Sequence, residues 1–458
     1  MRIRPLALLL FFPLALITSP AALAATPTVS ADFSKPTNPK NQMGFMHGAV
    51  THYRFADSNP AVIARANELL PGIWRGSDAA WSIDTDVALQ SGATPIHILS
   101  NLWNTEVPTK PGCAEMFLDG PLPFQNLNNW KAWVHQRALQ LASVQPTGEI
   151  WVDIWNEPDW WRFWPTKRND KCFSRSLVDS NGSKWLATFL AAEQVLRHDL
   201  GSRVKIIGPS AATSVWSWSE KLINFCASKG CKIDAISWHL CGGTQGSVDL
   251  IPGYTAKLRN NFIGLPNWQK ATAGAATKIW MTEYMPGAYH LMPGALTSYW
   301  YGLEKAGVDG GALAEWNDTN ARLDSLLERD GTPRSLWWAA RAYAVGRAAR
   351  VATSTNIGWW SMLASRQGLT GGAELMVGNN SMAAKPVTIN LSGLTAIHAN
   401  KTLAYQVRVL PQVGPGGAPM PTLPAAVISK QVAVNAGKAK IILTPPRGGM
   451  LLVQLQGS

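Results

Sequence analysis

Residues 150–159 read Ile-Trp-Val-Asp-Ile-Trp-Asn-Glu-Pro-Asp, a short run of branched and aromatic residues that stops at a proline. Such a run is typical of a buried strand, and Pro158 ends it because proline has no N–H with which to continue the pairing. Glu157 therefore stands directly after a strand. Glu283 follows a similar run, Lys-Ile-Trp-Met-Thr at 278–282, and lies 283 − 157 = 126 residues farther along the chain. Only the fold could bring these two carboxylates together.

Short apolar runs of this kind alternate with stretches of helical spacing over residues 41–350. Eight strands separated by helices are typical of a closed parallel (β/α)8 TIM barrel, and a span of roughly 300 residues fits that fold. A doubly wound open sheet is the alternative, but it usually carries a Gly-rich nucleotide turn after its first strand, which this sequence lacks. The candidate strands are 44–48, 73–75, 95–99, 150–155, 204–208, 235–239, 278–282 and 311–316, and the candidate helices include 129–142, 183–200, 218–229 and 296–306.

The chain changes character after Trp360. All 22 Trp residues lie between Trp74 and Trp360, and the later residues form short β-type runs separated by Gly, Pro and Asn. This pattern predicts an antiparallel β-sandwich at 351–458. Residues 25–40 are a short N-terminal segment that could join it. The predicted sandwich strands are 375–377, 387–391, 403–410, 427–434, 441–444 and 451–455.

The first 24 residues have the pattern of an export signal rather than of a folded element. Arg2 and Arg4 precede an apolar stretch at 6–17, and Ala22-Leu23-Ala24 matches a cleavage site of small residues. The apolar stretch is too short to span a membrane, and no later segment has a long apolar run. We therefore expect a periplasmic or secreted protein, cleaved near Ala24, without a stable membrane anchor.

Positive charge is in excess over the whole chain. The formal net charge is +12, and removal of Arg2 and Arg4 with the signal leaves 12 − 2 = +10. Such a charge favours an acidic partner, for example an anionic polysaccharide. The Lys and Arg residues are scattered and form no run, so a generic basic exported protein is the simpler interpretation and no nucleic acid is expected. We expect a monomer.

The five cysteines can form disulfides if the protein is exported. Cys226 and Cys231 are close in sequence, and Cys113 and Cys172 fall in loops that we place on one face of the barrel. We therefore expect the pairs Cys113–Cys172 and Cys226–Cys231, with Cys241 free, although spacing alone leaves other pairings open. No C-x-x-C spacing occurs, so no zinc site is expected.

Both glutamates belong to the mouth of the predicted barrel, because reactive groups in this fold sit at the C-terminal ends of the strands. Two carboxylates that face each other across a cleft are the minimal equipment for cleaving a glycosidic bond. An Asn-Glu-Pro on strand four with a Glu on strand seven resembles the clan A retaining glycoside hydrolases. The form Trp-Asn-Glu-Pro-Asp with a C-terminal sandwich is most similar to glycoside hydrolase family 39, which includes β-xylosidases, α-L-iduronidases and exopolysaccharide hydrolases.

The resemblance implies that Glu157 is the general acid/base, that Glu283 is the nucleophile and that Asn156 binds the sugar 2-hydroxyl. A retaining enzyme needs an ionised nucleophile and a protonated acid. Arg75, at the end of strand two, would lower the pKa of Glu283, whereas the aromatic neighbours of Glu157 would raise the pKa of that residue by desolvation. We expect the two carboxyl groups to lie about 5–5.5 Å apart.

The resemblance extends to three other strand ends. Arg75 matches a basic residue that keeps the nucleophile ionised, with an ion pair to the inward-facing Asp153 as an equal alternative. His239 matches a strand-six histidine. Trp316 matches the aromatic floor of the sugar subsite.

One position departs from the family pattern. The family usually has a Tyr two residues after the strand-six histidine, where this chain has Cys241. Either Tyr284 or Tyr289 would then supply that hydroxyl, or the geometry of the subsite differs. Further candidate sugar contacts, each with packing as the alternative, are His47, Trp103 and Trp160.

The tryptophan-rich loops after strands three and four predict a cleft for a polymer, since aromatic rings stack on sugars. We therefore expect an exported retaining O-glycosyl hydrolase, endo-acting through a glycosyl-enzyme intermediate, on an exopolysaccharide or biofilm-matrix glycan. An exo-acting β-xylosidase-type enzyme is the alternative. A non-catalytic glycan-binding matrix protein is the alternative from another class. The reaction needs no metal and no cofactor.

Overall fold

The computed structural model describes most of the chain between residues 26 and 456. The stretches outside the description are 1–25, 47–58, 77–80, 101–121, 161–162, 167–174, 213–214, 242–247, 263–264, 273–277, 286–290, 315–320, 382, 399–400, 414–416 and 457–458. The predicted export signal falls in the first of these. Within the described residues, no helix is long and apolar enough to cross a membrane.

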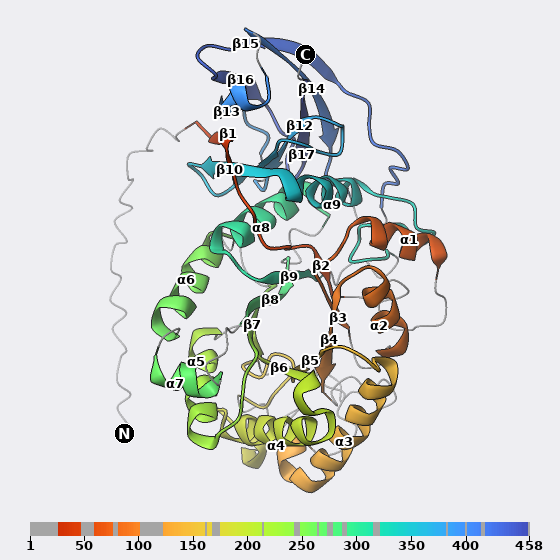
Figure 1. The fold of residues 1–458 in the computed structure, drawn as a ribbon, viewed down its shortest axis with the longest axis vertical. Helices are drawn as coiled ribbons and strands as arrows, with labels where there is room; N and C mark the ends of the chain where they lie inside the picture. Colours follow the sequence, from red (N-terminus) through yellow and green to blue (C-terminus); the bar gives the residue numbers. More distant parts are fainter. Residues whose placement is uncertain are drawn as a thin grey trace, which may run out of the picture.

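Eight parallel strands form a closed barrel, which confirms the predicted fold class (Figure 1). The first strand, β2, pairs with β3 on one side and with the last strand, β9, on the other, and this second pairing closes the ring. Each strand begins within one residue of its predicted start. The strands are β2 (Gly44–Phe45), β3 (Ile73–Gly76), β4 (Thr94–Leu99), β5 (Ile150–Ile154), β6 (Val204–Ala211), β7 (Ala235–Leu240), β8 (Lys278–Tyr284) and β9 (Gly310–Leu313).

Helices surround the barrel and cover the outward faces of the strands (Figure 1). The longest ones begin at clear signals: the Asn126 side chain caps α3 by accepting from the Asn129 N–H, and α4 lies between two glycines, Gly182 and Gly201. The helices are α1 (Pro60–Glu68), α2 (Trp81–Gln90), α3 (Leu127–Val144), α4 (Ser183–Leu200), α5 (Val215–Lys229), α6 (Leu250–Phe262), α7 (Pro266–Ala271), α8 (Pro293–Ala306) and α9 (Ser335–Gly346).

The floor of the barrel, at the N-terminal ends of the strands, is filled by two tryptophans. Trp151 of β5 and Trp280 of β8 pack with ring centroids 4.6 Å apart, and the aliphatic side chains of Ile73, Ile96 and Ile207 complete this buried cluster. Apolar packing therefore closes this end of the interior. Any site that needs access to solvent has to lie at the opposite end, the mouth.

The second domain is a single nine-stranded sheet that rolls over until its two edge strands, β15 and β16, come into contact. All neighbouring strands are antiparallel except β1 and β13, which are parallel, so the predicted antiparallel pattern is broken at one pair. Its order is β15-β14-β17-β12-β11-β10-β1-β13-β16. The strands are β1 (Thr28–Pro36), β10 (Arg350–Thr355), β11 (Trp360–Ser365), β12 (Ala373–Asn379), β13 (Val387–Ser392), β14 (Thr402–Leu410), β15 (Ile428–Ala433), β16 (Ala439–Leu443) and β17 (Met450–Gln456).

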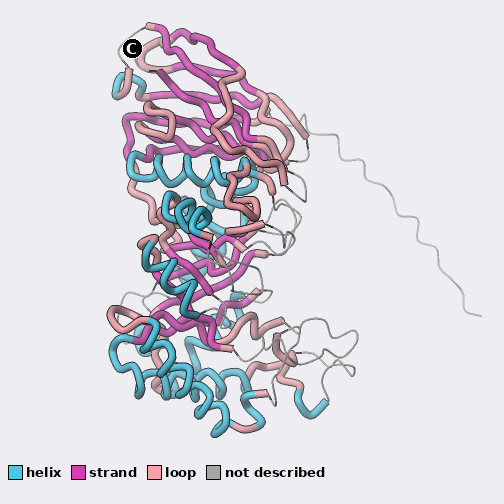
Figure 2. Tube along the Cα trace, turned by 90° about the vertical axis from the view of Figure 1, so that its right-hand side faces the viewer, coloured by secondary structure: helices cyan, strands magenta, loops and turns pink. Residues whose placement is uncertain are grey.

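Helices α8 and α9 lie between the sandwich and the barrel (Figure 1), where Figure 2 shows a layer of helices between two sets of strands. Alternate residues of β11 and β12 divide between two cores: Met362 belongs to the sandwich core, whereas Leu363 and Met376 belong to the core of the barrel and its helices. The junction is closely packed, because a Cβ on Gly294 of α8 would collide with the carbonyl oxygen of Asn379. The two domains therefore share one packed interface.

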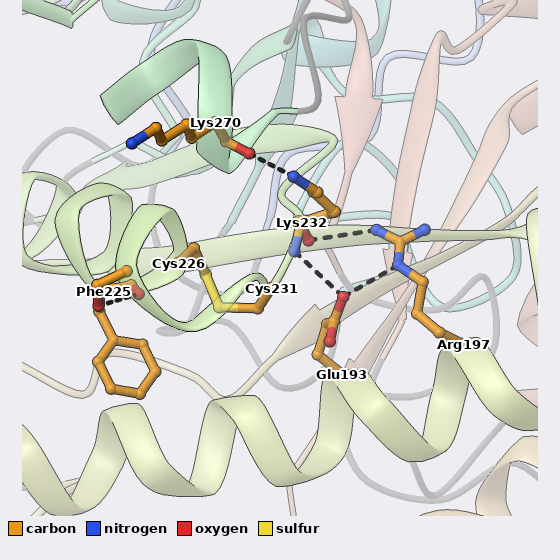
Figure 3. The surroundings of a disulfide bond; sticks show 8 residues. Glu193, Arg197, Phe225, Cys226, Cys231, Lys232 and Lys270 are labelled. Carbon is orange, nitrogen blue, oxygen red and sulfur yellow. Dashed lines mark hydrogen bonds and ion pairs between the residues drawn. A yellow bond between two sulfur atoms is a disulfide. The ribbon is translucent and has the colours of Figure 1, made fainter. Parts of the chain in front are cut away.

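One disulfide fixes the segment that leads into β7 (Figure 3). Cys226 near the end of α5 is bonded to Cys231, with the Cα atoms 4.5 Å apart. The neighbouring Lys232 N–H donates to Glu193 Oε1 (3.1 Å), and Arg197 pairs with the same carboxylate (3.1 Å). The disulfide and this ion pair thus anchor the β7 entry to α5 and α4.

The remaining cysteine predictions divide into two outcomes. Cys226–Cys231 is confirmed, and Cys241 is a free cysteine as predicted. Cys113 and Cys172 lie outside the described residues, so their pairing stays a prediction.

Candidate active site

The structure brings the two glutamates together at the mouth of the barrel. Glu157 follows β5, the fourth barrel strand, and Glu283 lies near the end of β8, the seventh. Both carboxylates are buried. One carboxylate oxygen of each lies within 4.8 Å of the other and of a ring nitrogen of His239. The 126-residue separation therefore corresponds to two strands that approach each other across the barrel.

A left-handed backbone directs Glu157 into the mouth. Trp155 and Glu157 have φ angles of 75° and 46°, and Ser210 of β6 has φ 49°. Each such non-glycine residue costs about 1–3 kcal/mol and persists only where its surroundings hold it in place. Here the Glu157 N–H donates to the Ser210 carbonyl (3.1 Å), and the Trp155 indole donates to the carbonyl of Phe163 (3.0 Å). Backbone strain is thus concentrated next to the buried carboxylate.

A bulge in β8 turns Glu283 toward the interior. The pairing of β8 shifts register against both β7 and β9 around Thr282, and a bulge of this kind re-aims the side chain that follows it. As a result Thr282 and Glu283 both face inward, with Thr282 Oγ1 3.2 Å from Ser210 Oγ. Tyr284 then faces outward, because successive residues of a strand point to opposite sides.

Arg75 of β3 binds three acceptors with its guanidinium group. Its Nε donates to Asp153 Oδ2 (2.9 Å), its Nη1 to Glu283 Oε1 (2.5 Å) and its Nη2 to Asn156 Oδ1 (2.8 Å). Burial alone would lower the pKa of Arg75, but Asp153 and Glu283 outweigh that effect and raise it. The two alternatives from the sequence, a contact with Glu283 and an ion pair with Asp153, are thus both present.

A buried hydroxyl network lies beneath the carboxylates. Ser210 Oγ donates to Asp153 Oδ2 (2.6 Å) and lies 2.8 Å from Ser237 Oγ. Sequence reasoning missed Ser210, Ser237 and Thr282. The sequence contained a signal for these residues, because polar side chains within otherwise apolar strands are candidates for a buried hydrogen-bond network. Together with Arg75, these groups form a continuous connection from the Glu157 backbone to the Glu283 carboxylate.

His239 of β7 lies between the two glutamates. Its Nδ1 is 2.7 Å from Glu157 Oε1 and 3.6 Å from Glu283 Oε2. Burial, and then the positive charge of Arg75, lower the pKa of His239 well below its ordinary value of 6.5. The imidazole is therefore neutral at neutral pH. It can form a hydrogen bond with Glu157 without placing a positive charge beside that carboxyl group.

Cys241 takes the position beside Glu283 where the family resemblance led us to expect a tyrosine. Its Sγ lies 3.6 Å from Glu283 Oε2. Burial, followed by the charges of Glu283 and Glu157, raises the pKa of Cys241 well above its ordinary value. The side chain is therefore a protonated thiol at neutral pH, and its S–H is a weak donor to the carboxylate.

The expected sugar contact by Tyr284 is wrong. Its hydroxyl donates to the carbonyl of Gln42 (3.3 Å) and accepts from the Trp300 indole (3.1 Å), and its ring stacks on Tyr299. These partners lie on the helix side of β8, because the bulge leaves Tyr284 pointing away from the interior. The other candidate, Tyr289, lies outside the described residues.

Only some of the other residues that the sequence predicted to contact sugar lie within the described part of the chain. Trp160 is partly exposed just after Glu157 and packs edge-on against Phe163, with centroids 5.5 Å apart. Trp164 is fully buried and donates to Asp179 Oδ2 (2.9 Å), so it serves packing. His47, Trp103 and Trp316 fall outside the residues that the structure describes.

Comparison with known proteins adds evidence on the fold. No protein-family model matches this sequence, and no curated protein matches it either. Solved structures do match over nearly the whole length. The structure of N2152 from Neocallimastix frontalis has a TM-score of 0.70 at 16% identity and covers 94% of this chain and 100% of its own.

Two further solved structures carry the same architecture. The GH39 enzyme from Xanthomonas axonopodis pv. citri has a TM-score of 0.61 at 14% identity, covering 97% of this chain and 100% of its own. A monomeric beta-xylosidase from Caulobacter crescentus CB15 has a TM-score of 0.61 at 13% identity, covering 94% and 99%. At these identities the likeness establishes the fold, a TIM barrel with a C-terminal sandwich.

Proposed function

We propose that this protein is a retaining glycoside hydrolase with Glu157 as general acid/base and Glu283 as nucleophile. The observation that carries the proposal is the separation of the two carboxylates, whose facing oxygens lie within 4.8 Å of each other. Retaining enzymes place the two groups about 5–5.5 Å apart, whereas inverting enzymes leave about 6.5–9.5 Å for a water molecule. The short separation supports direct attack on the anomeric carbon.

The partners of each carboxylate support the division of roles. Glu283 receives the charged Nη1 of Arg75, and an adjacent positive charge favours the ionised form that a nucleophile needs. Glu157 instead faces the neutral imidazole of His239 at 2.7 Å, which supplies no charge to hold it ionised. Glu157 is therefore the group better suited to carry a proton in the resting enzyme.

The reaction then proceeds in two displacements. Glu283 attacks the anomeric carbon while Glu157 protonates the leaving oxygen, and a glycosyl-enzyme ester forms on Glu283. Glu157, now ionised, removes a proton from water, which attacks the same carbon and releases the sugar with its original configuration. With Asp153 and Glu283 ionised and Arg75 protonated, these three paired groups sum to −1, which offsets the positive charge that develops on the sugar ring.

Asn156 supports sugar binding through the orientation of its amide. Its Oδ1 accepts from Arg75 Nη2 (2.8 Å), so the amide nitrogen is the end that can donate to a sugar hydroxyl. Because Arg75 also holds Glu283, the group that binds the sugar and the nucleophile share one anchor. This arrangement supports the role of a 2-hydroxyl contact.

The substrate that we propose is a polysaccharide, with an exopolysaccharide or biofilm-matrix glycan as the leading candidate and endo action as the mode. The half-buried Trp160 beside Glu157 supports a stacking site next to the cleaved bond. Export is proposed from the signal-like first 24 residues, and the Cys226–Cys231 disulfide is consistent with an oxidising compartment. An exo-acting β-xylosidase is the second candidate, because solved structures of this fold include proteins named β-xylosidases.

The test is hydrolysis of a panel of exopolysaccharides and aryl glycosides, with products followed by mass spectrometry and by proton NMR of the anomeric signal. Retention of configuration and a ladder of short products are expected. First-formed product of inverted configuration would overturn the retaining mechanism, and monosaccharide as the only product would overturn endo action. Unchanged cleavage by both Glu157→Gln and Glu283→Gln would remove the site assignment itself.

A further inference from the structure

Three side chains that can bind a metal ion gather at the barrel mouth, and Cys241 lies next to one of them. One ligand atom from each of Glu157, His239 and Glu283 lies within 4.8 Å of the other two, and all three residues are buried. Cys241 Sγ adds a sulfur 3.6 Å from Glu283 Oε2. The proposed hydrolysis makes no use of this thiol. Among the described residues, no other three His, Cys, Asp or Glu side chains gather in this way.

The donor set selects the class of ion. Imidazole nitrogen and cysteine sulfur are ligands for borderline cations such as Zn²⁺, whereas Mg²⁺ and Ca²⁺ take oxygen ligands almost exclusively. The mixed nitrogen, sulfur and oxygen set therefore favours Zn²⁺ over the two common hard cations.

The charge of the mouth also suits a divalent ion. With Glu157, Glu283, Asp153 and the Cys241 thiolate ionised and Arg75 protonated, these five groups carry −4 + 1 = −3. A divalent cation reduces that charge to −3 + 2 = −1, which is the charge of the metal-free site with Glu157 and Cys241 protonated. Buried charges are tolerated only when they are paired, so the ion compensates the two charges that the loss of those protons creates.

We propose that this mouth binds a borderline divalent cation, with Zn²⁺ as the representative ion, through Cys241, His239, Glu157 and Glu283, and that the bound ion excludes substrate. Zinc bonds of about 2.0–2.2 Å to N and O allow two such ligands at most about 4.4 Å apart. His239 Nδ1 already lies within this limit of Glu157 Oε1 (2.7 Å) and of Glu283 Oε2 (3.6 Å). The S–H bond breaks as the Zn–S bond forms, and the proton passes to solvent. No electron is transferred.

The ion and the substrate would occupy the same position, between Glu157 and Glu283. The blocking of catalysis rests on the proposed function, but the binding of the ion does not.

The test measures binding without reference to activity. The full chain is unfolded by heat in chelator-free buffer with ZnCl₂ or with MgCl₂. We expect Zn²⁺ to raise Tm, Mg²⁺ to leave it unchanged and EDTA to reverse the shift. Cys241→Ser, with Cys241→Ala as a second variant, should weaken the apparent affinity for Zn²⁺ by at least about tenfold, the scale on which metal sites respond to lost partners.

A matched control removes a pair of surface histidines that could compete for zinc. His135 and His198 each lie within 2.8 Å of a carboxylate oxygen of Asp199 through Nδ1, and exposed imidazoles of this kind can bind zinc adventitiously. The double variant His135→Ala, His198→Ala should keep the full Zn²⁺ response. A response lost in this variant, or one unchanged in both Cys241 variants, would overturn the proposal, as would the absence of any Zn²⁺ shift.

A second arm measures inhibition on whichever substrate the panel identifies. Zn²⁺ should raise KM without changing kcat, as expected for an ion that excludes substrate, and inhibition that lowers kcat alone would overturn the assigned position. If no glycan is cleaved while Zn²⁺ still raises Tm through Cys241, the hydrolase assignment fails and the metal site stands. If a glycan is cleaved but Zn²⁺ changes neither Tm nor KM, the metal site fails and the hydrolase assignment stands.

Discussion

The floor and the mouth of the barrel are built from the same eight strands and have opposite chemistry. Along β5, Trp151 fills the floor, Asp153 lies in the middle of the interior and Glu157 follows at the mouth. Along β8, Trp280 fills the floor and Glu283 reaches the mouth. One short strand thus passes from close apolar packing to paired buried charge.

The difference shows where stability arises and where reactivity is possible. The floor buries large apolar side chains, which is the main favourable contribution to folding. The mouth buries Arg75 and several carboxylates, whose desolvation is costly even when they are paired, and it contains left-handed residues such as Trp155 and Glu157. Stabilisation at the floor and in the helix layer offsets the cost of the mouth.

The largest expected effect comes from removing a charge at the mouth. Glu283→Gln should lower kcat/KM by about 10⁴-fold or more, since the covalent step is lost, and Glu157→Gln by about 10²–10⁴-fold. Tm should change little. Glu149→Gln, near the floor and exposed, is the matched control and should keep full activity. Equal activity of Glu283→Gln and Glu149→Gln would show that the mouth is not the reactive end.

A substitution at the floor should affect stability and leave the chemistry intact. Trp280→Ala removes a large, fully buried ring and should lower the free energy of unfolding by about 3–5 kcal/mol, measured by urea titration. The kcat of the folded fraction should be unchanged. Trp359→Ala, at a tryptophan that is 40% exposed, should change stability by only about 0.5 kcal/mol. A large loss of kcat in Trp280→Ala at full folding would show that floor and mouth are not separable.

The next prediction concerns the pH dependence of stability at His97, which lies on the outer face of a strand between floor and mouth. It lies in β4 between Ile96 of the floor and Ile98 of the mouth, and burial lowers its pKa from 6.5 to about 4. As the pH falls, His97 is protonated in the unfolded chain before it is protonated in the folded protein. The contribution of neutral His97 to the free energy of unfolding is therefore fully present above pH 6.5 and is lost as the pH falls toward 4. The loss amounts to about 3 kcal/mol.

Replacement of His97 by Gln should remove that part of the acid sensitivity. The measurement is the urea midpoint at neutral pH and near pH 4, with His198→Gln as the control because His198 is highly exposed. A wild-type protein whose stability falls no more steeply than that of His97→Gln would contradict the assignment.

The smallest expected effect concerns Asp153, which acts on the mouth through Arg75. Asp153→Asn keeps the shape but removes one of the two carboxylates that pair with Arg75, and kcat should fall by about 10-fold to 100-fold, as for other outer hydrogen-bond partners of reactive groups. The charge of Arg75, then paired with Glu283 alone, stabilises ionised Glu283 more strongly, so the acid limb of kcat/KM should move to lower pH.

The shift of the acid limb separates positioning from simple support of the fold. Asp234→Asn is the matched control, because Asp234 pairs with Arg197 in the outer layer (2.9 Å) and should change stability alone. If Asp153→Asn lost kcat as expected but kept the acid limb of the wild-type protein, Asp153 would have a structural role only.

Much of the barrel could be predicted because its strands are short apolar runs with clear ends. Sandwich strand β11 was missed because its residues are buried on both faces: one face packs in the sandwich and the other on α8. Such a strand lacks the apolar–polar alternation that identifies a half-exposed one.

The candidate site was predictable at Glu157, Glu283, Arg75 and His239, because each ends a strand, and parallel strands of a barrel end on one face. Tyr284 was assigned to the wrong side, because no sequence pattern reveals the register shift in β8. A single extra residue in a strand reverses every side chain after it.

The sequence by itself determined the strand order, the sides on which floor and mouth lie and the two carboxylates that meet. These follow from local patterns: apolar period, proline stops and the rule that barrel strands end together. Only the tertiary structure decided that Arg75 binds Asp153, Asn156 and Glu283 at once, and that Cys241 lies beside Glu283 and Tyr284 does not. Those outcomes depend on bulges, left-handed turns and contacts between distant strands, which carry energies of a few kcal/mol and leave no periodic trace in the chain.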